Sequence, residues 1–254
     1  MKKILFVFLI LYVYKIQSQN FIAKGKVDYD MYSNTDGLKN YNAILYFNEN
    51  YSKFVFNVKG LAQNVIETTK DDASQHLEVV IRDTTETAII HSVKEKKLYI
   101  LNQKVNVWEE SGSQEWILEE EVKEIGSLLC SKATCKFRGR NYTAWYAPAI
   151  PLPYGPWKFN GLPGLIIELY DHNKDVYFSM LQLKIPFNQE IEGLKGNENF
   201  ITRKELKIID EENNKKFIKR MNEKAQRMQA SSGKDETIKI SISPSIEKKG
   251  IELD

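Results

Sequence analysis

The stretch Tyr41–Phe47 (YNAILYF), the polar residues Asn48-Glu49-Asn50 and the stretch Ser52–Val58 (SKFVFNV) decide the fold. Both outer runs are rich in aromatic and β-branched side chains, which favour extended strands. The three polar residues between them tolerate the unusual backbone angles of a tight turn. The sequence therefore predicts a β-hairpin over residues 41–58.

Strand signals continue on both sides of this hairpin. Between Phe21 and Met31 the odd positions are apolar or small and most even positions are charged, a period of two that is typical of a half-buried strand. Further β-rich runs recur about every ten residues, at 77–82, 87–92, 97–101, 105–109 and 115–118, and then at 137–147, 165–170 and 176–185. This spacing predicts an antiparallel meander, with the polar residues 60–75 forming a long loop or a short irregular element.

The pattern changes near the C-terminus. Thr202 and Glu205 have the spacing of a capping box. Apolar residues then recur at multiples near 3.6, at Leu206, Ile209, Phe217, Met221, Ala225 and Met228. We therefore expect an amphipathic helix near residues 203–230, and its apolar stripe must cover something. The predicted fold is mainly β, of the α+β class: a curved antiparallel sheet or half-barrel wrapped on this C-terminal helix.

The N-terminus has the features of an export signal. Lys2 and Lys3 precede the apolar run Ile4–Val13, and a polar segment follows. We expect residues 1–19 to be a signal peptide cleaved near Gln19; a buried N-terminal strand or a short anchor is the alternative. The predicted location is the periplasm, the outer membrane surface or the extracellular space. No other apolar stretch approaches the ~18 residues of a membrane span, so we expect no transmembrane segment in the mature form.

Composition constrains the partners. The chain has 254 residues, with 36 basic and 34 acidic side chains and a formal net charge of +2. Removing residues 1–19 takes away three lysines and no acid, which leaves 33 basic against 34 acidic residues and a net of −1. Such a balance argues against nucleic acid as a partner. We expect one domain over residues 20–243, which includes a last strand at 237–243, and a flexible tail over 244–254.

The chain has two cysteines, Cys130 and Cys135. In an exported protein, a close pair predicts a disulfide. Side chains five residues apart in a straight strand point to opposite faces, so a bridge requires residues 131–134 to form a turn. Two free thiols and a metal site are the alternatives, but His76, His91 and His172 are scattered singly, so we expect no metal and no cofactor.

Aromatic residues gather between Tyr142 and Tyr177, where eight of the chain's 29 aromatics lie. Two interpretations remain open: an aromatic groove that binds a ligand, or a plug that closes one end of a β-sheet core. The residues of this candidate binding surface are Trp145, Tyr146, Tyr154, Trp157 and Phe159.

The same region ends in the turn motif Gly161-Leu162-Pro163-Gly164-Leu165-Ile166. Proline fixes φ at the second position of a turn and glycine supplies a positive φ at the third, so Leu162–Leu165 predicts a type II turn with a positive φ at Gly164. Gly161 would let the backbone approach a neighbour closely.

These residues resemble a known family. The complete hexapeptide Gly161–Ile166, together with Arg138-Gly139-Arg140, Trp145, Ile150-Pro151, Gly155-Pro156 and Phe159, looks like the signature of the GLPGLI family of exported proteins, found mainly in Bacteroidetes. The family often ends in Asn-Pro-Ile-Glu-Leu, whereas this chain has Lys249-Gly250-Ile251-Glu252-Leu253. The resemblance implies export and, since members are commonly encoded near outer-membrane receptor systems, an envelope setting. It implies no activity.

The sequence favours a non-enzymatic exported protein that binds a peptide, a small hydrophobic ligand such as a lipid, or an outer-membrane partner through its sheet. One alternative is an envelope hydrolase that uses Asp171 and His172, with Glu168 and Asp175 nearby. Ser179 lacks the glycines of a nucleophile elbow, and we assign no catalytic residue. The other alternative is a purely structural role.

Overall fold

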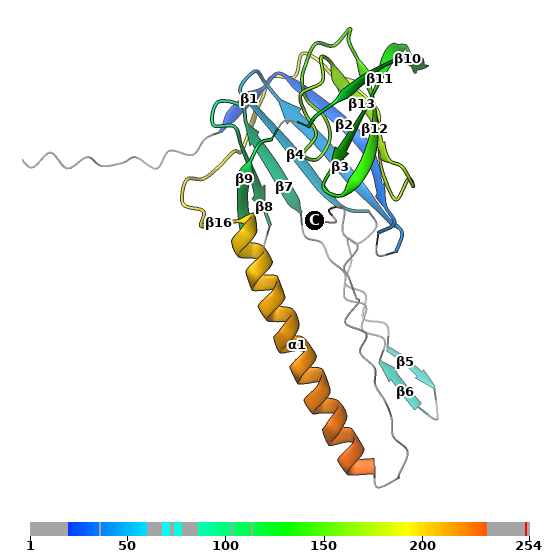
Figure 1. The fold of residues 1–254 in the computed structure, drawn as a ribbon, viewed down its shortest axis with the longest axis vertical. Coiled ribbons are helices and arrows are strands. Elements are labelled where there is room, and N and C mark those ends of the chain that lie inside the picture. The colour runs from blue at the N-terminus through cyan, green and yellow to red at the C-terminus, as the bar shows by residue number, and fades with distance from the viewer. Residues whose placement is uncertain are drawn as a thin grey trace, which may run out of the picture.

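The computed structural model describes residues 20–35, 37–59, 68–71, 74–77, 86–102, 104–112, 114–232 and 252. These form one large curved sheet, two small strand pairs and one long helix (Figure 1). The large sheet contains β2 (Gly25–Ser33), β3 (Lys39–Phe47), β4 (Tyr51–Val58), β7 (Thr87–Ser92), β8 (Lys97–Leu101), β9 (Asn106–Glu110), β10 (Ile117–Ile125), β11 (Leu128–Phe137), β12 (Arg140–Ala147), β13 (Leu165–Asp171), β14 (Val176–Lys184) and β16 (Phe200–Thr202). The small pairs are β1 (Phe21–Ala23) with β15 (Gln189–Ile191) and β5 (Thr68–Asp71) with β6 (Ser74–Leu77), and the helix is α1 (Arg203–Ser232).

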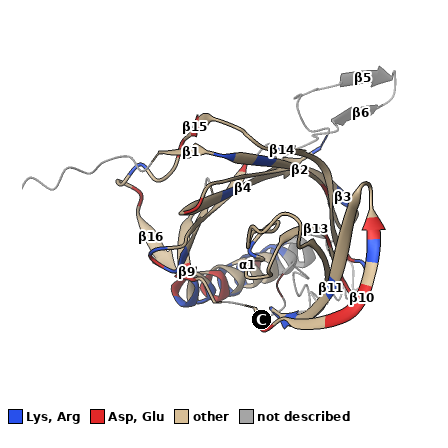
Figure 2. Ribbon diagram, turned by 90° about the horizontal axis from the view of Figure 1, so that it is seen from above, with Lys and Arg blue, Asp and Glu red and all other residues tan. Residues whose placement is uncertain are grey.

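The large sheet joins two antiparallel meanders through one crossover. Its strand order is β10-β11-β12-β13-β14-β2-β3-β4-β7-β8-β9-β16, so β14 pairs with β2 in the middle. Only the short pairing of β16 with β9 is parallel among the described strands. The sheet curves strongly and stays open, with β10 and β16 as its edges (Figure 2). The prediction of a mainly β, curved antiparallel sheet with a C-terminal helix is confirmed.

The predicted hairpin over residues 41–58 is confirmed as β3 and β4, with Phe47 opposite Ser52. The Asn48 side-chain oxygen accepts hydrogen bonds from the backbone amides of Asn50 and Tyr51, both at 2.9 Å, and so fixes the turn. In β2 alternate side chains are buried, as the period of two predicts.

Strands β10 and β11 are longer than the sequence pattern indicates. The pattern gave a strand at 115–118 and none between 119 and 136, whereas β10 reaches Ile125 and β11 follows at once. An edge strand exposes most of its side chains, so it can contain a charged run such as Glu119-Glu120-Glu121. This run lacks the apolar alternation by which a strand is predicted from the sequence. Residues 60–75, predicted as a long loop or a short irregular element, include β5 and part of β6.

Helix α1 begins as the capping box predicts. The Glu205 amide donates to the Thr202 hydroxyl at 3.2 Å, and the Glu205 carboxylate accepts from the Thr202 amide at 2.7 Å. The helix does not lie under the sheet, however. Its contacts concentrate on β9 and β16, it projects away from the sheet (Figure 1), and Ile208, Ile209 and Phe217 are exposed. The expectation that the sheet wraps on the helix is wrong because the inner face is already covered by residues 148–164, as described below.

No helix among the described residues combines the length and apolar character needed to cross a membrane. The predicted signal peptide at 1–19 and the predicted last strand at 237–243 lie outside the described residues. So does most of the strand predicted at 77–82.

The predicted disulfide is wrong. Cys130 and Cys135 are buried free thiols. Residues 131–134 do not turn: β11 runs through them in unbroken register with β12, so the two side chains point to opposite faces of the sheet. Burial raises the pKa of Cys135 to about 12 and also raises that of Cys130, so both stay protonated at neutral pH.

The thiols give a direct test. Iodoacetamide added to the unfolded protein without a reductant should label both cysteines, and a reductant should leave the melting temperature of the folded protein unchanged. Mass spectrometry and thermal unfolding measure these outcomes. Labelling that requires prior reduction would show that the bridge exists after all.

Candidate functional site

The connection between β12 and β13, residues 148–164, folds back onto the inner face of the sheet; we call it the plug. The Tyr154 hydroxyl donates a hydrogen bond to the Asn48 carbonyl at 2.6 Å, and its ring lies 5.6 Å from that of Phe47. On the other side, the Trp116 indole donates to the Asn160 carbonyl at 2.9 Å. The plug is therefore anchored both to the hairpin and to the segment that leads into β10.

The five aromatic residues proposed as a binding surface are buried. Their side chains are at most 7% exposed: Trp145, Tyr146, Tyr154, Trp157 and Phe159. The Phe159 ring packs against Tyr142 at 4.7 Å and against Phe137 at 5.2 Å between centroids. Rings packed this way fill a core, so the three aromatic residues of the plug and the two on β12 are core residues and do not line an open groove.

The two glycines of the hexapeptide have roles opposite to those predicted. Gly161 has a φ of +90° with open space around it, whereas Gly164 has no positive φ. A Cβ on Gly164 would lie 2.3 Å from the Ala147 carbonyl oxygen. The predicted type II turn is wrong because it requires a positive φ at Gly164, which Gly164 does not have. Leu162, Leu165 and Ile166 are fully buried beside it, and Pro163 is exposed.

Five charged side chains from distant segments meet beside the plug; we call them the charge cluster. They are Glu109 of β9, Arg138 of the β11–β12 turn, Lys158 of the plug, Arg203 of α1 and Glu252 near the C-terminus. The Lys158 ammonium lies 2.8 Å from one Glu109 oxygen and 2.5 Å from a Glu252 oxygen. Arg138 lies 2.9 Å from Glu109, and Arg203 contacts Glu252 and lies 3.8 Å from Glu109.

Lys158 is the most unusual group of this cluster, because its side chain is only 6% exposed. Burial lowers its pKa to about 8, and the positive charges of Arg138 and Arg203 act in the same direction. The Glu109 carboxylate opposes this shift without cancelling it. Sequence reasoning missed the cluster because its members are spread over five segments and share no motif. Glu252 also shows that the predicted flexible tail contains a docked residue.

The candidate hydrolase residues are not assembled into a catalytic group. The Asp171 carboxylate is buried, 2.7 Å from the Arg140 guanidinium, and accepts the Val176 amide at 2.9 Å, so it closes the β13–β14 hairpin. Asp175 lies 3.7 Å from the same arginine. His172 is exposed in the turn.

Glu168 and Ser179 lie elsewhere. Glu168 is three residues from Asp171 on the same strand, so it points to the opposite face of the sheet. There it pairs with Lys123 and accepts a hydrogen bond from the Tyr177 hydroxyl at 2.8 Å. Ser179 stands opposite Glu168 on β14. The carboxylates, the histidine and the serine therefore do not form an acid, base and nucleophile in contact.

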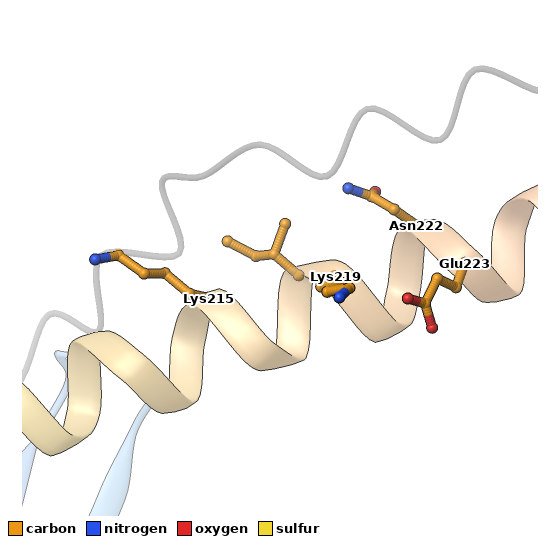
Figure 3. A pocket seen from close by; sticks show the side chains of 5 residues that line it. Lys215, Lys219, Asn222 and Glu223 are labelled. Atoms are coloured by element: carbon orange, nitrogen blue, oxygen red, sulfur yellow. The ribbon is translucent and has the colours of Figure 1, made fainter.

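No metal centre is found in the described parts of the chain. No group of three or more metal-binding side chains gathers there. The Ser111 hydroxyl and the His91 Nε2 atom form a hydrogen bond of 2.7 Å, and burial lowers the pKa of His91. A shallow hollow runs along α1 between Lys215 and Glu223 (Figure 3). All its lining residues come from one helix, so it lacks a facing wall within the described residues.

Comparison with known proteins gives a family match but no activity. A family model described as a protein of unknown function (Porph_ging) matches residues 136–168, which include the end of β11, β12, the plug and the start of β13. No curated protein matches the sequence.

Solved structures show only distant likeness. Structures of PNGF-II in the C2 and P21 space groups are 14% and 12% identical, with TM-scores of 0.45, and cover 70% and 71% of this chain. The chain spans only 30% and 31% of those proteins. An uncharacterized conserved protein from Thermus thermophilus is 9% identical, with a TM-score of 0.36, over 74% of this chain and 93% of its own. At these scores none of them identifies a function.

Gly164→Ala should destabilise the fold by about 2–3 kcal/mol, because the new methyl group meets a backbone carbonyl that cannot move aside. Gly112→Ala is the matched control, since a Cβ there meets nothing within 4 Å. Urea unfolding measures both. Equal effects at the two positions would contradict the close approach at Gly164.

Lys158→Met should change how stability depends on pH. The folded pKa of Lys158 is about 8 against 10.5 for the free side chain, so the unfolded chain binds more protons between these values. The unfolding free energy of the wild type relative to the variant should therefore rise with pH, by about 2 kcal/mol between about pH 7 and about pH 9.5. Urea unfolding across this range measures the difference. A difference that falls or stays flat would contradict the assigned shift.

Proposed function

We propose that this chain is an exported, non-enzymatic binding protein of the cell envelope and a member of the GLPGLI family, and that it captures an extended, basic peptide segment of an envelope protein along strand β10. The observation that carries the proposal is the β10 edge itself: a nine-residue strand at the end of the large sheet, with exposed apolar and acidic side chains.

The backbone of β10 is available on one side. Among the described strands, β10 pairs with β11 alone, and a register shift interrupts this pairing between Leu118 and Val122. The outer side of the strand therefore presents amide and carbonyl groups that no described strand pairs with. An extended peptide can add to such an edge, gaining affinity from main-chain hydrogen bonds and specificity from side-chain contacts. The opposite edge, β16, has only three residues and leads directly into α1.

Large apolar side chains surround this edge. Ile117, Leu118 and Val122 of β10 are 67%, 57% and 55% exposed, and Leu129 of β11 is 64% exposed. Ile117 and Leu118 are adjacent and point to opposite faces of the strand, so each face offers an apolar side chain that an added peptide would cover.

The charge of the edge selects the partner. Strand β10 contains four glutamates and one lysine. Glu119 and Glu121 both pair with Lys132, at 2.9 and 2.7 Å, whereas Glu120 and Glu124 have no ion-pair partner among the described residues. Two copies of this strand would repel each other, which disfavours edge-to-edge self-association. A segment that carries lysine or arginine would be attracted instead.

The other observations favour a peptide over a lipid and binding over catalysis. The inner face, where a lipid carrier would hold an acyl chain, is filled by the plug. The Asp171 carboxylate pairs with Arg140 and accepts the Val176 amide within the β13–β14 hairpin, and His172 is exposed in the turn. Export rests on the charged, apolar and polar order of residues 1–19 and on the resemblance of the hexapeptide region.

Photo-crosslinking in the native host tests the edge. A photoreactive residue at Leu129 should crosslink one envelope protein through an extended basic segment, and the crosslinked chain should have a mass that lacks residues 1–19. Glu120→Lys combined with Glu124→Lys should lower the yield at least about tenfold, which corresponds to about 1.4 kcal/mol of binding free energy.

Two controls accompany this experiment. Glu211→Lys combined with Glu223→Lys on α1 makes the same charge change on exposed residues far along the chain and should leave the yield unchanged. The photoreactive residue at Leu181, which is 67% exposed on β14, should not give the same product. Identical products from both positions, or equal losses in both charge variants, would refute binding at β10.

A further inference from the structure

The charge cluster holds a carboxylate that comes from far away in the sequence. Glu252 is 94 residues from Lys158, yet it accepts a hydrogen bond from the Lys158 ammonium through Oε1. Its other oxygen, Oε2, contacts the Arg203 guanidinium. Each carboxylate oxygen of Glu252 therefore contacts a different cationic side chain. Proteins bind carboxylate ligands through contacts of this kind.

Exposure differs across the cluster. The side chains of Glu109 and Lys158 are each 6% exposed and form its base. Arg138, Arg203 and Glu252 are 21%, 30% and 20% exposed and form its mouth. Glu109 is therefore a fixed part of the structure, whereas Glu252 occupies the solvent side of the cluster.

Charge counting shows what Glu252 does there. Among the described residues, Lys158 contacts two carboxylates when Glu252 is present, and Glu109 alone when Glu252 is absent; Glu109 also lies close to Arg138 and Arg203. A buried ammonium beside two guanidinium groups needs a second negative charge, because unpaired charges are strongly disfavoured away from water. Without Glu252, the cluster would attract another carboxylate.

We propose that Lys158, Arg203 and Arg138 form a carboxylate-binding site for an acidic peptide, and that Glu252 of the chain itself is its resident occupant. In the sequence Glu252 stands between Ile251 and Leu253. The ligand class is a peptide that offers a carboxylate, and the sequence around Glu252 supplies the probe that tests it. This site includes β9 and the start of α1, at the opposite end of the strand order from β10, so it is independent of the edge proposed above.

Peptide binding to the full-length Glu252→Gln variant tests the site. The probe is the amidated peptide Lys-Gly-Ile-Glu-Leu with a fluorescent label, followed by anisotropy. The variant should bind this peptide at least tenfold more tightly than the wild type, whose site is occupied. The same peptide with glutamine in place of glutamate should bind at least tenfold more weakly, and added salt should weaken binding of the glutamate peptide.

Further variants separate recognition from folding. Glu252→Asp keeps the charge on a shorter side chain and should give an affinity between those of the wild type and Glu252→Gln. Adding Arg203→Gln to Glu252→Gln should abolish binding. Glu212→Gln, an exposed glutamate paired with Lys216 on α1, should bind like the wild type. Equal binding by wild type and Glu252→Gln, or equal binding of the glutamate and glutamine peptides, would overturn the proposal.

Discussion

The inner face of a strongly curved open sheet must be covered by apolar side chains of the same chain, and the rest of this structure depends on how that is achieved. Residues 148–164 supply the cover, and at Gly164 the chain passes so close to the end of β12 that a Cβ would lie 2.3 Å from the Ala147 carbonyl oxygen. The buried Tyr29 hydroxyl donates to the Ile166 carbonyl at 2.6 Å and ties the plug's exit to the central strand β2. Any side chain at position 164 would push this whole layer outward.

Because the plug fills the inner face, the remaining elements are free of that task. Helix α1 has no face of the sheet left to cover and projects from β16, which explains its exposed apolar residues. The surfaces available for recognition then lie at the ends of the strand order. One is the acidic edge of β10, and the other is the charge cluster beside β9.

Local patterns predicted much of this fold, and long-range contacts explain what they missed. The 41–58 hairpin and the Thr202–Glu205 capping box depend on neighbouring residues, so the sequence reveals them. The roles of Gly161 and Gly164 depend on where Ala147 lies, which no local pattern contains. The disulfide failed because residues 131–134 continue a strand that the sequence pattern did not predict, and a five-residue spacing within a strand separates the side chains. The charge cluster was invisible because its carboxylates and cations meet only in the folded chain.

Two ion pairs of this protein illustrate different uses of charge. The Arg140–Asp171 pair is 8% and 3% exposed and joins adjacent strands, and its carboxylate also accepts a hydrogen bond from the Val176 amide. The Arg203–Glu252 pair is 30% and 20% exposed and joins segments 49 residues apart. Buried charges seldom add net stability compared with apolar side chains. The pKa of Lys158 is lowered because the loss of hydration on burial disfavours the ammonium more than the Glu109 carboxylate stabilises it. A cluster that gains little stability and opens to solvent is better suited to recognising a carboxylate than to holding the fold.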